Sequence, residues 1–246
     1  MDTPNSLGVA DTDGTNNDIG LQFGFHGQTL NRAVPEREIG GDSHTAIRVV
    51  SRSASSITGV NVMWRTLLSI LFARRRVRRN GLVPPRTVTR IRLTTLPTDI
   101  DILRHMNNGR YLSLFDLGRW DLLVRTGVAD VMKQQNWYAV VSAETITFRK
   151  SLQLWQRFTV ESRLLGHDDR AIYMEHRAVV KGEIYAKVIV RARMLKRGGG
   201  TVSHEELFAA VGKPDMIPDI ADWVHEWAVA SSLPSPRQDA PSVWED

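Results

Sequence analysis

The 246-residue chain contains no cysteine. This absence excludes disulfide bonds, a thiolate zinc site and a cysteine nucleophile, and it favours a cytoplasmic protein. Long apolar runs are also missing. The run from Val60 to Phe72 is interrupted by Arg65, and its thirteen residues are fewer than the roughly 20 that span a bilayer. The N-terminus lacks a charged segment followed by an apolar run, so we expect no secretory signal.

Several catalytic motifs are absent as well. No serine lies in a Gly-x-Ser-x-Gly elbow, so the sequence does not support an α/β-hydrolase mechanism. No glycine-rich phosphate loop and no histidine-rich metal spacing are present. We therefore expect neither a metal ion nor a cofactor.

Acidic residues are missing from one region. Between Asp42 and Asp99 there are 11 arginines and no aspartate or glutamate, which leaves 21 basic and 27 acidic residues in the rest of the chain. The formal net charge of +5 is thus concentrated in this region. No nucleic-acid-binding motif accompanies the arginines, and we expect no nucleic-acid partner.

Composition divides the chain into four parts. Residues 1–59 are predicted to be a flexible extension, because their Asp, Asn, Gly, Thr and Ser content shows no sustained period. Residues 60–85 form an amphipathic, arginine-rich segment, for which we favour a helix docked on the protein over contact of residues 60–80 with a membrane surface. Residues 86–212 form the folded domain. Residues 213–246 are a tail in which one short helix is expected at 220–230. Met63 is a candidate alternative start.

Polar side chains are concentrated between Asp99 and Tyr111, directly before the longest apolar helical pattern. The first turn of a helix leaves backbone N–H groups unpaired and carries the positive end of the helix dipole. A developing negative charge is stabilised at that position. Either Asn107 or Asn108 is a suitable N-cap, and Gly109 allows close approach to the backbone.

The remaining pattern predicts an early strand, a buried helix and four later strands. Alternation places Val140, Ser142, Glu144, Ile146 and Phe148 on one face of the first later strand. Gly127 ends the helix, and Ser203 and Glu206 form a capping pair for another. The predicted helices are 109–126, 129–135 and 203–211, and the predicted strands are 87–95, 137–149, 157–165, 171–181 and 184–196.

The order Asp-x-Asp-x-x-x-His-x-Asn-Asn-x-x-Tyr, at Asp99 to Tyr111, resembles the start of the central helix in hotdog-fold acyl-thioesterases. The likeness extends over about residues 86–212. It is shared with plant acyl-carrier-protein thioesterases and with acyl-CoA thioesterases related to 4-hydroxybenzoyl-CoA thioesterase. The resemblance implies an α+β hotdog fold, in which a five-stranded antiparallel sheet wraps around a central helix.

The resemblance also implies roles for residues in this stretch. Asp101 takes the place of the family carboxylate, as general base or nucleophile. His105 lies near the thioester, and Asn107 and Asn108 orient a carbonyl or a water molecule. Amide groups at 108–110 are candidates for an oxyanion hole. The chain departs from the plant enzymes at two places: Leu103 replaces an asparagine, and Trp155-Gln156 replaces a Gly-Asp turn. Asp99 is expected to hold the turn.

Glu144 is a carboxylate among apolar side chains, so it either has a partner or serves chemistry. His176 is expected to be a hydrogen-bonded core histidine, and Asp116 and Arg119 a structural pair. The strand residues Lys187, Arg191 and Arg193 are further candidates for coenzyme A phosphates. The catalytic candidates are Asp101, His105, Asn107 and Glu144, and the substrate-binding candidates are Asn108, Gly109, Arg110, Tyr111, Arg149 and Lys150.

The resemblance implies a homodimer or tetramer that acts on acyl-CoA or acyl-carrier-protein thioesters in fatty acid metabolism. Two alternatives remain open on the same fold. One is acyl-thioester binding without hydrolysis, including a role at the membrane periphery, and the other is hydration of an enoyl thioester. The sequence does not specify acyl chain length or head group.

Overall fold

The computed structural model describes residues 44–212, 220–235 and 237–244, with side chains from residue 61 onward. The helices are α1 (His44–Asn80), η1 (Pro97–Asp99), α2 (Asn108–Arg125), α3 (Val128–Gln134), α4 (His204–Val211) and α5 (Asp222–Ala230). The strands are β1 (Thr89–Thr94), β2 (Trp137–Phe148), β3 (Arg157–His167), β4 (Ile172–Val180) and β5 (Glu183–Lys196).

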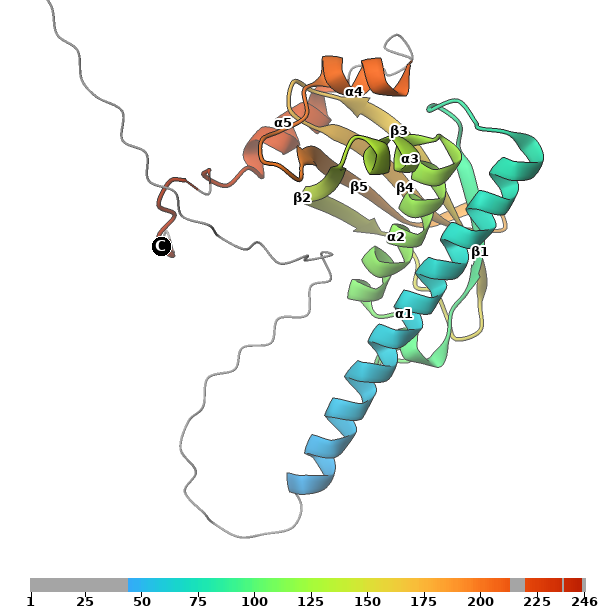
Figure 1. Cartoon of the computed structure of the whole chain (residues 1–246). Coiled ribbons are helices and arrows are strands. Elements are labelled where there is room, and N and C mark those ends of the chain that lie inside the picture. The colour runs from blue at the N-terminus through green and yellow to red at the C-terminus, as the bar shows by residue number, and fades with distance from the viewer. Residues whose placement is uncertain (1–43, 213–219, 236, 245–246) are drawn as a thin grey trace, which may run out of the picture. The chain divides into compact units, whose positions relative to one another are not determined.

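The five strands form one antiparallel sheet in the order β1-β3-β4-β5-β2. Helix α2 lies against one face of this sheet, and α1 runs alongside α2 (Figure 1). This arrangement is the hotdog fold that the resemblance implied. β1 and β2 are the two edge strands, and they lie at opposite sides of the sheet.

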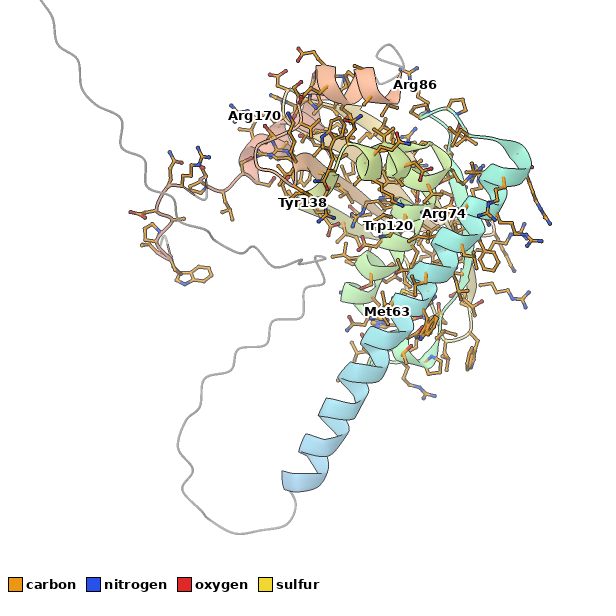
Figure 2. The ribbon with its side chains drawn as sticks, viewed as in Figure 1. Met63, Arg74, Arg86, Trp120, Tyr138 and Arg170 are labelled. Atoms are coloured by element: carbon orange, nitrogen blue, oxygen red, sulfur yellow. The ribbon has the colours of Figure 1, made fainter. Side chains whose placement is uncertain are left out.

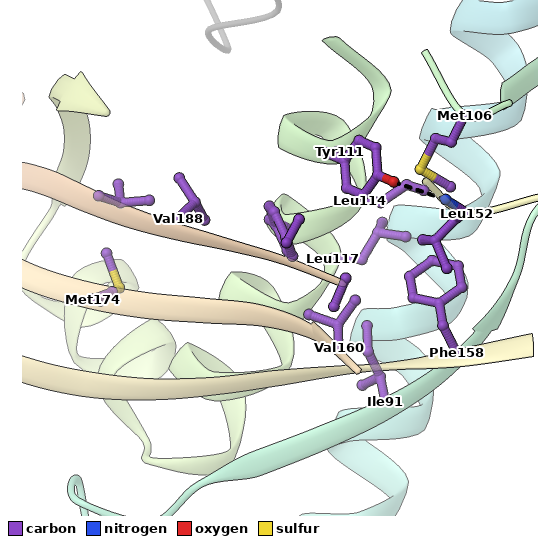
Figure 3. Close-up of a cluster of buried hydrophobic side chains, with 14 of the residues drawn as sticks. Ile91, Met106, Tyr111, Leu114, Leu117, Leu152, Phe158, Val160, Met174 and Val188 are labelled. Carbon is purple, nitrogen blue, oxygen red and sulfur yellow. Dashed lines mark hydrogen bonds between the residues drawn. The ribbon is translucent and has the colours of Figure 1, made fainter. Parts of the chain in front are cut away.

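The main core lies between α2 and the sheet (Figure 3). Leu114 and Leu117 of α2 are at most 1% exposed and pack with Val160 of β3 and Val188 of β5. Gly118 lies so close to β3 that an added Cβ atom would be 2.4 Å from the Ser162 Oγ. The helix therefore needs a residue without a side chain where it approaches the sheet.

The opposite face of the sheet is covered by α5. Neighbouring residues of a strand point to opposite faces, and Tyr173 and Ile189 accordingly pack with Val224 and Ala228 of α5. A third cluster, at one end of the sheet, joins α3 and α4 through Met132, Trp137, Met194, Val202 and Leu207.

The helices and strands predicted for residues 86–212 are all present, with bounds that differ by at most three residues. The helix expected at 220–230 is α5. One prediction was wrong: residues 44–59, assigned to the flexible extension, belong to α1. The segment contains no proline, and adding turns to an existing helix costs far less than nucleating a new one. The rest of the predicted extension, residues 1–43, lies outside the described residues.

The predicted face of β2 also needs a correction. The pairing of β2 with β5 shifts between Val141 and Ala143, so Ser142 is an extra residue in a β-bulge. The bulge reverses the alternation. Glu144 is opposite Val190, a core residue, whereas Val140 is opposite Arg193 and does not share the face of Glu144.

Candidate active site

The conserved-looking polar stretch forms a short hairpin that leads into α2. The Asp101 N–H donates to the His105 carbonyl at 3.0 Å, and Ile100 pairs with Met106. Arg104 adopts a left-handed backbone conformation with φ of 66°, which closes the turn at a cost for a non-glycine residue. The Met106 N–H donates to the Leu152 carbonyl at 2.8 Å and ties the hairpin to the segment after β2.

Asp101 and His105 face each other across this turn. The Asp101 Oδ2 lies 3.6 Å from the His105 Nδ1, and the two side chains are 20% and 30% exposed. The Asp101 Oδ1 accepts a hydrogen bond of 2.9 Å from the Leu103 N–H. The carboxylate is therefore oriented by its own turn, and it remains accessible to solvent.

Asn107 is the N-cap of α2, one of the two residues predicted for this position. Its side-chain oxygen accepts from the Gly109 N–H at 2.9 Å. Its carbonyl accepts from the Arg110 N–H, also at 2.9 Å. Within the described part of the chain, the Asn108 N–H has no acceptor. Of the three amides proposed for an oxyanion hole, Asn108 is thus the one that is open to a ligand.

The turn is anchored by Asp99, whose side chain is fully buried. Its carboxylate is 2.8 Å from the Arg65 guanidinium of α1 and 3.2 Å from that of Arg110. It also accepts from the Leu96 N–H at 2.9 Å. Burial of a charge is tolerated when it is paired and hydrogen-bonded in this way, so Asp99 holds the turn as expected. Arg65 was not predicted as part of the site; an arginine within an apolar run was its one signal.

Glu144 faces α2 from β2. Its carboxylate is 3.7 Å from the Arg119 guanidinium, and its side chain is 24% exposed. Arg119 also binds Asp116, which confirms that pair. Burial raises the pKa of Asp116, and the nearby Arg119 acts in the opposite direction. Glu144 therefore belongs to a charged cluster on the sheet-facing side of α2, separate from the Asp101 hairpin in sequence and in its contacts.

His176 is a core histidine, as predicted. It is fully buried, its Nδ1 is 2.8 Å from the Ser162 Oγ, and its ring stacks on Phe115. Burial, together with the charge of Arg119, lowers the pKa of His176 to about 3. The imidazole is consequently neutral at physiological pH.

Two predicted substrate contacts are structural in this chain. Tyr111 is 2% exposed, and its hydroxyl accepts from the Leu152 N–H at 3.1 Å. Burial raises its pKa. Arg110 is held by Asp99, and its side chain is 14% exposed. Both lie beneath the turn because residues three positions apart at a helix start point to the same side, here the core.

The predicted phosphate-binding cations differ in their surroundings. Arg149 and Lys150 are exposed and share Glu183, at 2.6 and 2.8 Å. Lys187 lies over the Trp223 ring. Arg191 is 8% exposed and donates to the Ser232 Oγ at 3.1 Å, so its assignment as a phosphate ligand was wrong. It points to the face covered by α5 and anchors that helix.

Cavities are found away from the hairpin. One of about 340 Å³ is lined by residues that include His167, Asp168 and His225, and one of about 60 Å³ by residues that include Ser162 and Glu175. Asp101 lines neither of them. The surface beside Asp101 instead carries exposed apolar side chains. They are Ile102 (96% exposed), Leu103 (68%), Leu154 (42%) and Trp155 (61%).

Trp155 explains one departure from the family pattern. Its φ is 61°, a left-handed conformation that glycine adopts at little cost. A Gly-Asp turn suits this position for that reason, and the chain places a tryptophan there instead. The Trp155 N–H donates to the Thr95 carbonyl at 3.0 Å, which keeps the turn joined to the end of β1.

Comparison with known proteins agrees with this architecture. The profile of the thioesterase-like superfamily matches residues 95–227. Protein THEM6 of Xenopus laevis is 32% identical over 131 residues, which cover 52% of this chain and 63% of that protein. The probable thioesterase YBR096W of Saccharomyces cerevisiae is 23% identical over 118 residues, which cover 47% of this chain and 51% of that protein. The chain thus spans less than two thirds of the length of these relatives.

One solved structure illustrates the likeness. The probable thioesterase YbaW of Escherichia coli has a TM-score of 0.48 and 20% sequence identity, over 52% of this chain and 98% of that one.

Proposed function

The chain belongs to the thioesterase-like superfamily, and we propose from this premise that it hydrolyses acyl-CoA thioesters to a free carboxylic acid and coenzyme A. The observation that carries the proposal is the hairpin before α2. It presents an oriented carboxylate, a histidine and an open helix N-terminal amide within eight residues, from Asp101 to Asn108.

Thioester hydrolysis requires a base or nucleophile and a donor for the carbonyl oxygen that becomes negative. As a general base, Asp101 takes a proton from water, and the resulting hydroxide forms a bond to the thioester carbon. As a nucleophile, it forms an anhydride that water then cleaves. In both routes the C–S bond breaks and the coenzyme A thiolate leaves and takes up a proton.

The open Asn108 amide is our candidate for the oxyanion donor. It lies in the first turn of α2, where the helix dipole adds to the effect of the hydrogen bond. His105, 3.6 Å from Asp101, is placed to orient the carboxylate or to protonate the leaving thiolate. The Asn107 side chain caps the helix and fixes the direction of the neighbouring amides.

We further propose that the site is completed in a homodimer or a dimer of dimers formed through β2. β2 is an edge strand, and exposed edges invite pairing with another strand. Its apolar side chains Tyr138, Val140, Val141 and Phe148 are 37–41% exposed, which suits an interface better than contact with water. A second subunit would supply a wall for the acyl group, and exposed Arg149 and Lys150 are candidates for the coenzyme A phosphates.

Asp101→Asn tests the proposal. We expect thiol release from a panel of acyl-CoAs to fall by about 10²–10⁴-fold, because the amide can neither take a proton nor attack. The matched control is Asp130→Asn, which removes an exposed carboxylate from α3 and should leave turnover unchanged. Circular dichroism and sedimentation establish that both variants keep the fold and the assembly. Unchanged turnover in Asp101→Asn contradicts the assignment.

The same assays separate the other readings of the fold. Acyl-CoA binding without thiol release indicates a non-hydrolytic binding protein. Loss of enoyl-CoA absorbance without thiol release indicates a hydratase. Comparison of acyl-CoA with acyl carrier protein as the thiol carrier, over several chain lengths, then identifies the substrate class.

A further inference from the structure

The described part of α1 has an unusual distribution of polar and apolar side chains. Its domain-facing side is largely polar: Arg65 binds Asp99, Arg76 lies 2.7 Å from Asp121, and the Ser69 hydroxyl donates to the Leu117 carbonyl at 3.0 Å. Val62 and Ala73 are the two buried apolar residues on this side. The helix is thus attached to α2 and the turn mainly by ion pairs and hydrogen bonds.

The outward side is apolar. Six residues at i, i+1, i+4, i+5, i+8 and i+9 form a continuous strip along the helix, which we call the apolar stripe. A helix on the surface of a water-soluble domain normally has the reverse arrangement, with its apolar side against the core. The apolar stripe consists of Met63 (48% exposed), Trp64 (59%), Leu67 (51%), Leu68 (47%), Leu71 (59%) and Phe72 (53%).

A basic segment follows the stripe directly. Arg74, Arg75, Arg78 and Arg79 are exposed in the last two turns of α1, and we call them the arginine end. Met63 and Arg74, at the start of the stripe and of the arginine end, are labelled on the helix in Figure 2. No acidic residue occurs between Asp42 and Asp99. Neither the stripe nor its borders therefore offers a negative charge to the arginines.

We propose that the apolar stripe and the arginine end dock together on the surface of an anionic lipid bilayer. The helix would lie in the plane of the interface, with the stripe among the acyl chains and the arginines at the phosphates. This partner satisfies both features at once. A second copy of α1 would cover the stripe, but it would bring more arginines and no acids. Within the described residues, no helix has the length and apolar character needed to cross a bilayer.

The attachment of α1 to the domain supports this orientation. The residues that hold α1 on α2 and on the turn, among them Arg65, Ser69 and Arg76, are separate from the stripe. Docking would therefore need no rearrangement of the described fold. It also leaves the Asp101 hairpin attached to a helix that lies at the membrane surface.

The test uses the full chain and sedimentation with vesicles of phosphatidylcholine alone or with 30% phosphatidylglycerol. We expect the wild type to sediment with the anionic vesicles and much less with the neutral ones. Leu67→Gln/Leu71→Gln should lower the partition coefficient at least about tenfold, because two buried aliphatic side chains are lost. Arg74→Gln/Arg75→Gln should lower it about fivefold for each arginine, and only with anionic vesicles.

Two control variants match these changes elsewhere on the surface. Val229→Gln/Leu233→Gln removes two side chains that are 65% and 88% exposed, and Arg170→Gln/Arg237→Gln removes two exposed arginines. Neither should change the partition coefficient. Hydrolysis of soluble acyl-CoA should be the same in all of these variants, so failure of the proposed enzymatic function is detected separately.

Two results overturn the proposal. One is a wild type that does not sediment with anionic vesicles, or stripe variants that sediment as it does. The other is a change of assembly mass in Leu67→Gln/Leu71→Gln, by sedimentation equilibrium without vesicles, together with no vesicle binding by the wild type. That outcome assigns the stripe to a second copy of the chain.

Discussion

Replacing Gly118 with alanine tests how closely α2 approaches the sheet. The added Cβ atom would lie 2.4 Å from the Ser162 Oγ and 2.6 Å from the Val160 Cγ1. Carbon atoms do not approach such neighbours within 3 Å, so either the helix moves outward or Ser162 changes its rotamer. Ser162 is not free to do so at no cost, because its Oγ is 2.8 Å from the Nδ1 of buried His176.

Three contributions set the expected size of the effect. Overpacking a core with one methyl group costs about 1–3 kcal/mol. Loss of the buried contact between Ser162 and His176 costs about 1–3 kcal/mol more, if the rotamer change breaks it. The higher helix propensity of alanine offsets about 1 kcal/mol. We therefore expect Gly118→Ala to lower the free energy of unfolding by about 1–4 kcal/mol, where an exposed helical glycine would show an increase.

Urea unfolding followed by circular dichroism measures this change, at a fixed protein concentration because assembly affects apparent stability. Gly198→Ala is the matched control. No atom lies within 4 Å of its added Cβ, and its backbone is not left-handed, so its free energy of unfolding should stay within about 0.5 kcal/mol of the wild type. A Gly118→Ala protein as stable as the wild type, or more stable, would refute the close approach of α2 to β3.

Three further predictions concern buried charges. Asp99→Ala leaves Arg65 and Arg110 without their carboxylate, so urea unfolding should show a loss of about 3–5 kcal/mol. The folded-state pKa of His176, about 3, lies below its unfolded value of about 6.5, so stability is complete above pH 6.5 and is lost toward pH 3. Unfolding at pH 7.5 and 5.0 should show this loss, at up to about 1.4 kcal/mol per pH unit, and His176→Gln should reduce it. Arg191→Ala removes the contact to Ser232, so amides of α5 should exchange hydrogen at least about tenfold faster, while exchange in α2 stays unchanged.

The elements of the hotdog domain were predictable because their signals are local. Strands β4 and β5 alternate regularly, with Met174, Ala178, Val188 and Val190 on the face toward α2. α2 is apolar around most of its circumference, as a helix enclosed by a sheet must be. Its N-cap is also a local feature, since Asn107 bonds the amide two residues further on.

Features that depend on distant partners were not predictable in the same way. The bulge at Ser142 is defined by the register between β2 and β5, and a one-residue shift reverses which side chains face the core. Arg191 reads as an exposed strand cation until α5 is placed over it. The outward stripe of α1 has the pattern of a core-facing helix. Its orientation depends on Arg65 and Arg76 finding carboxylates on other elements.

The candidate site divides along the same line. The turn, the cap and the anchoring role of Asp99 follow from residues within one short segment. The walls of a substrate pocket do not, because they require surfaces that a single segment cannot supply. Asp101 lines neither of the two cavities described, and the exposed apolar residues beside it, Ile102 and Leu103, have no cover within the described residues. Such a surface is what a site completed by a second subunit would show.

Asp99 connects the two proposals physically. Its carboxylate receives one guanidinium from α1 and one from α2, and it lies two residues before Asp101. The position of the Asp101 hairpin therefore depends on α1 staying in place, even though α1 supplies no group to the chemistry. The outer side of the same helix carries the apolar stripe. A surface that binds the stripe would hold α1 from outside while Arg65 holds the turn from inside, so the orientation of the protein on a bilayer would also set the direction in which the hairpin faces.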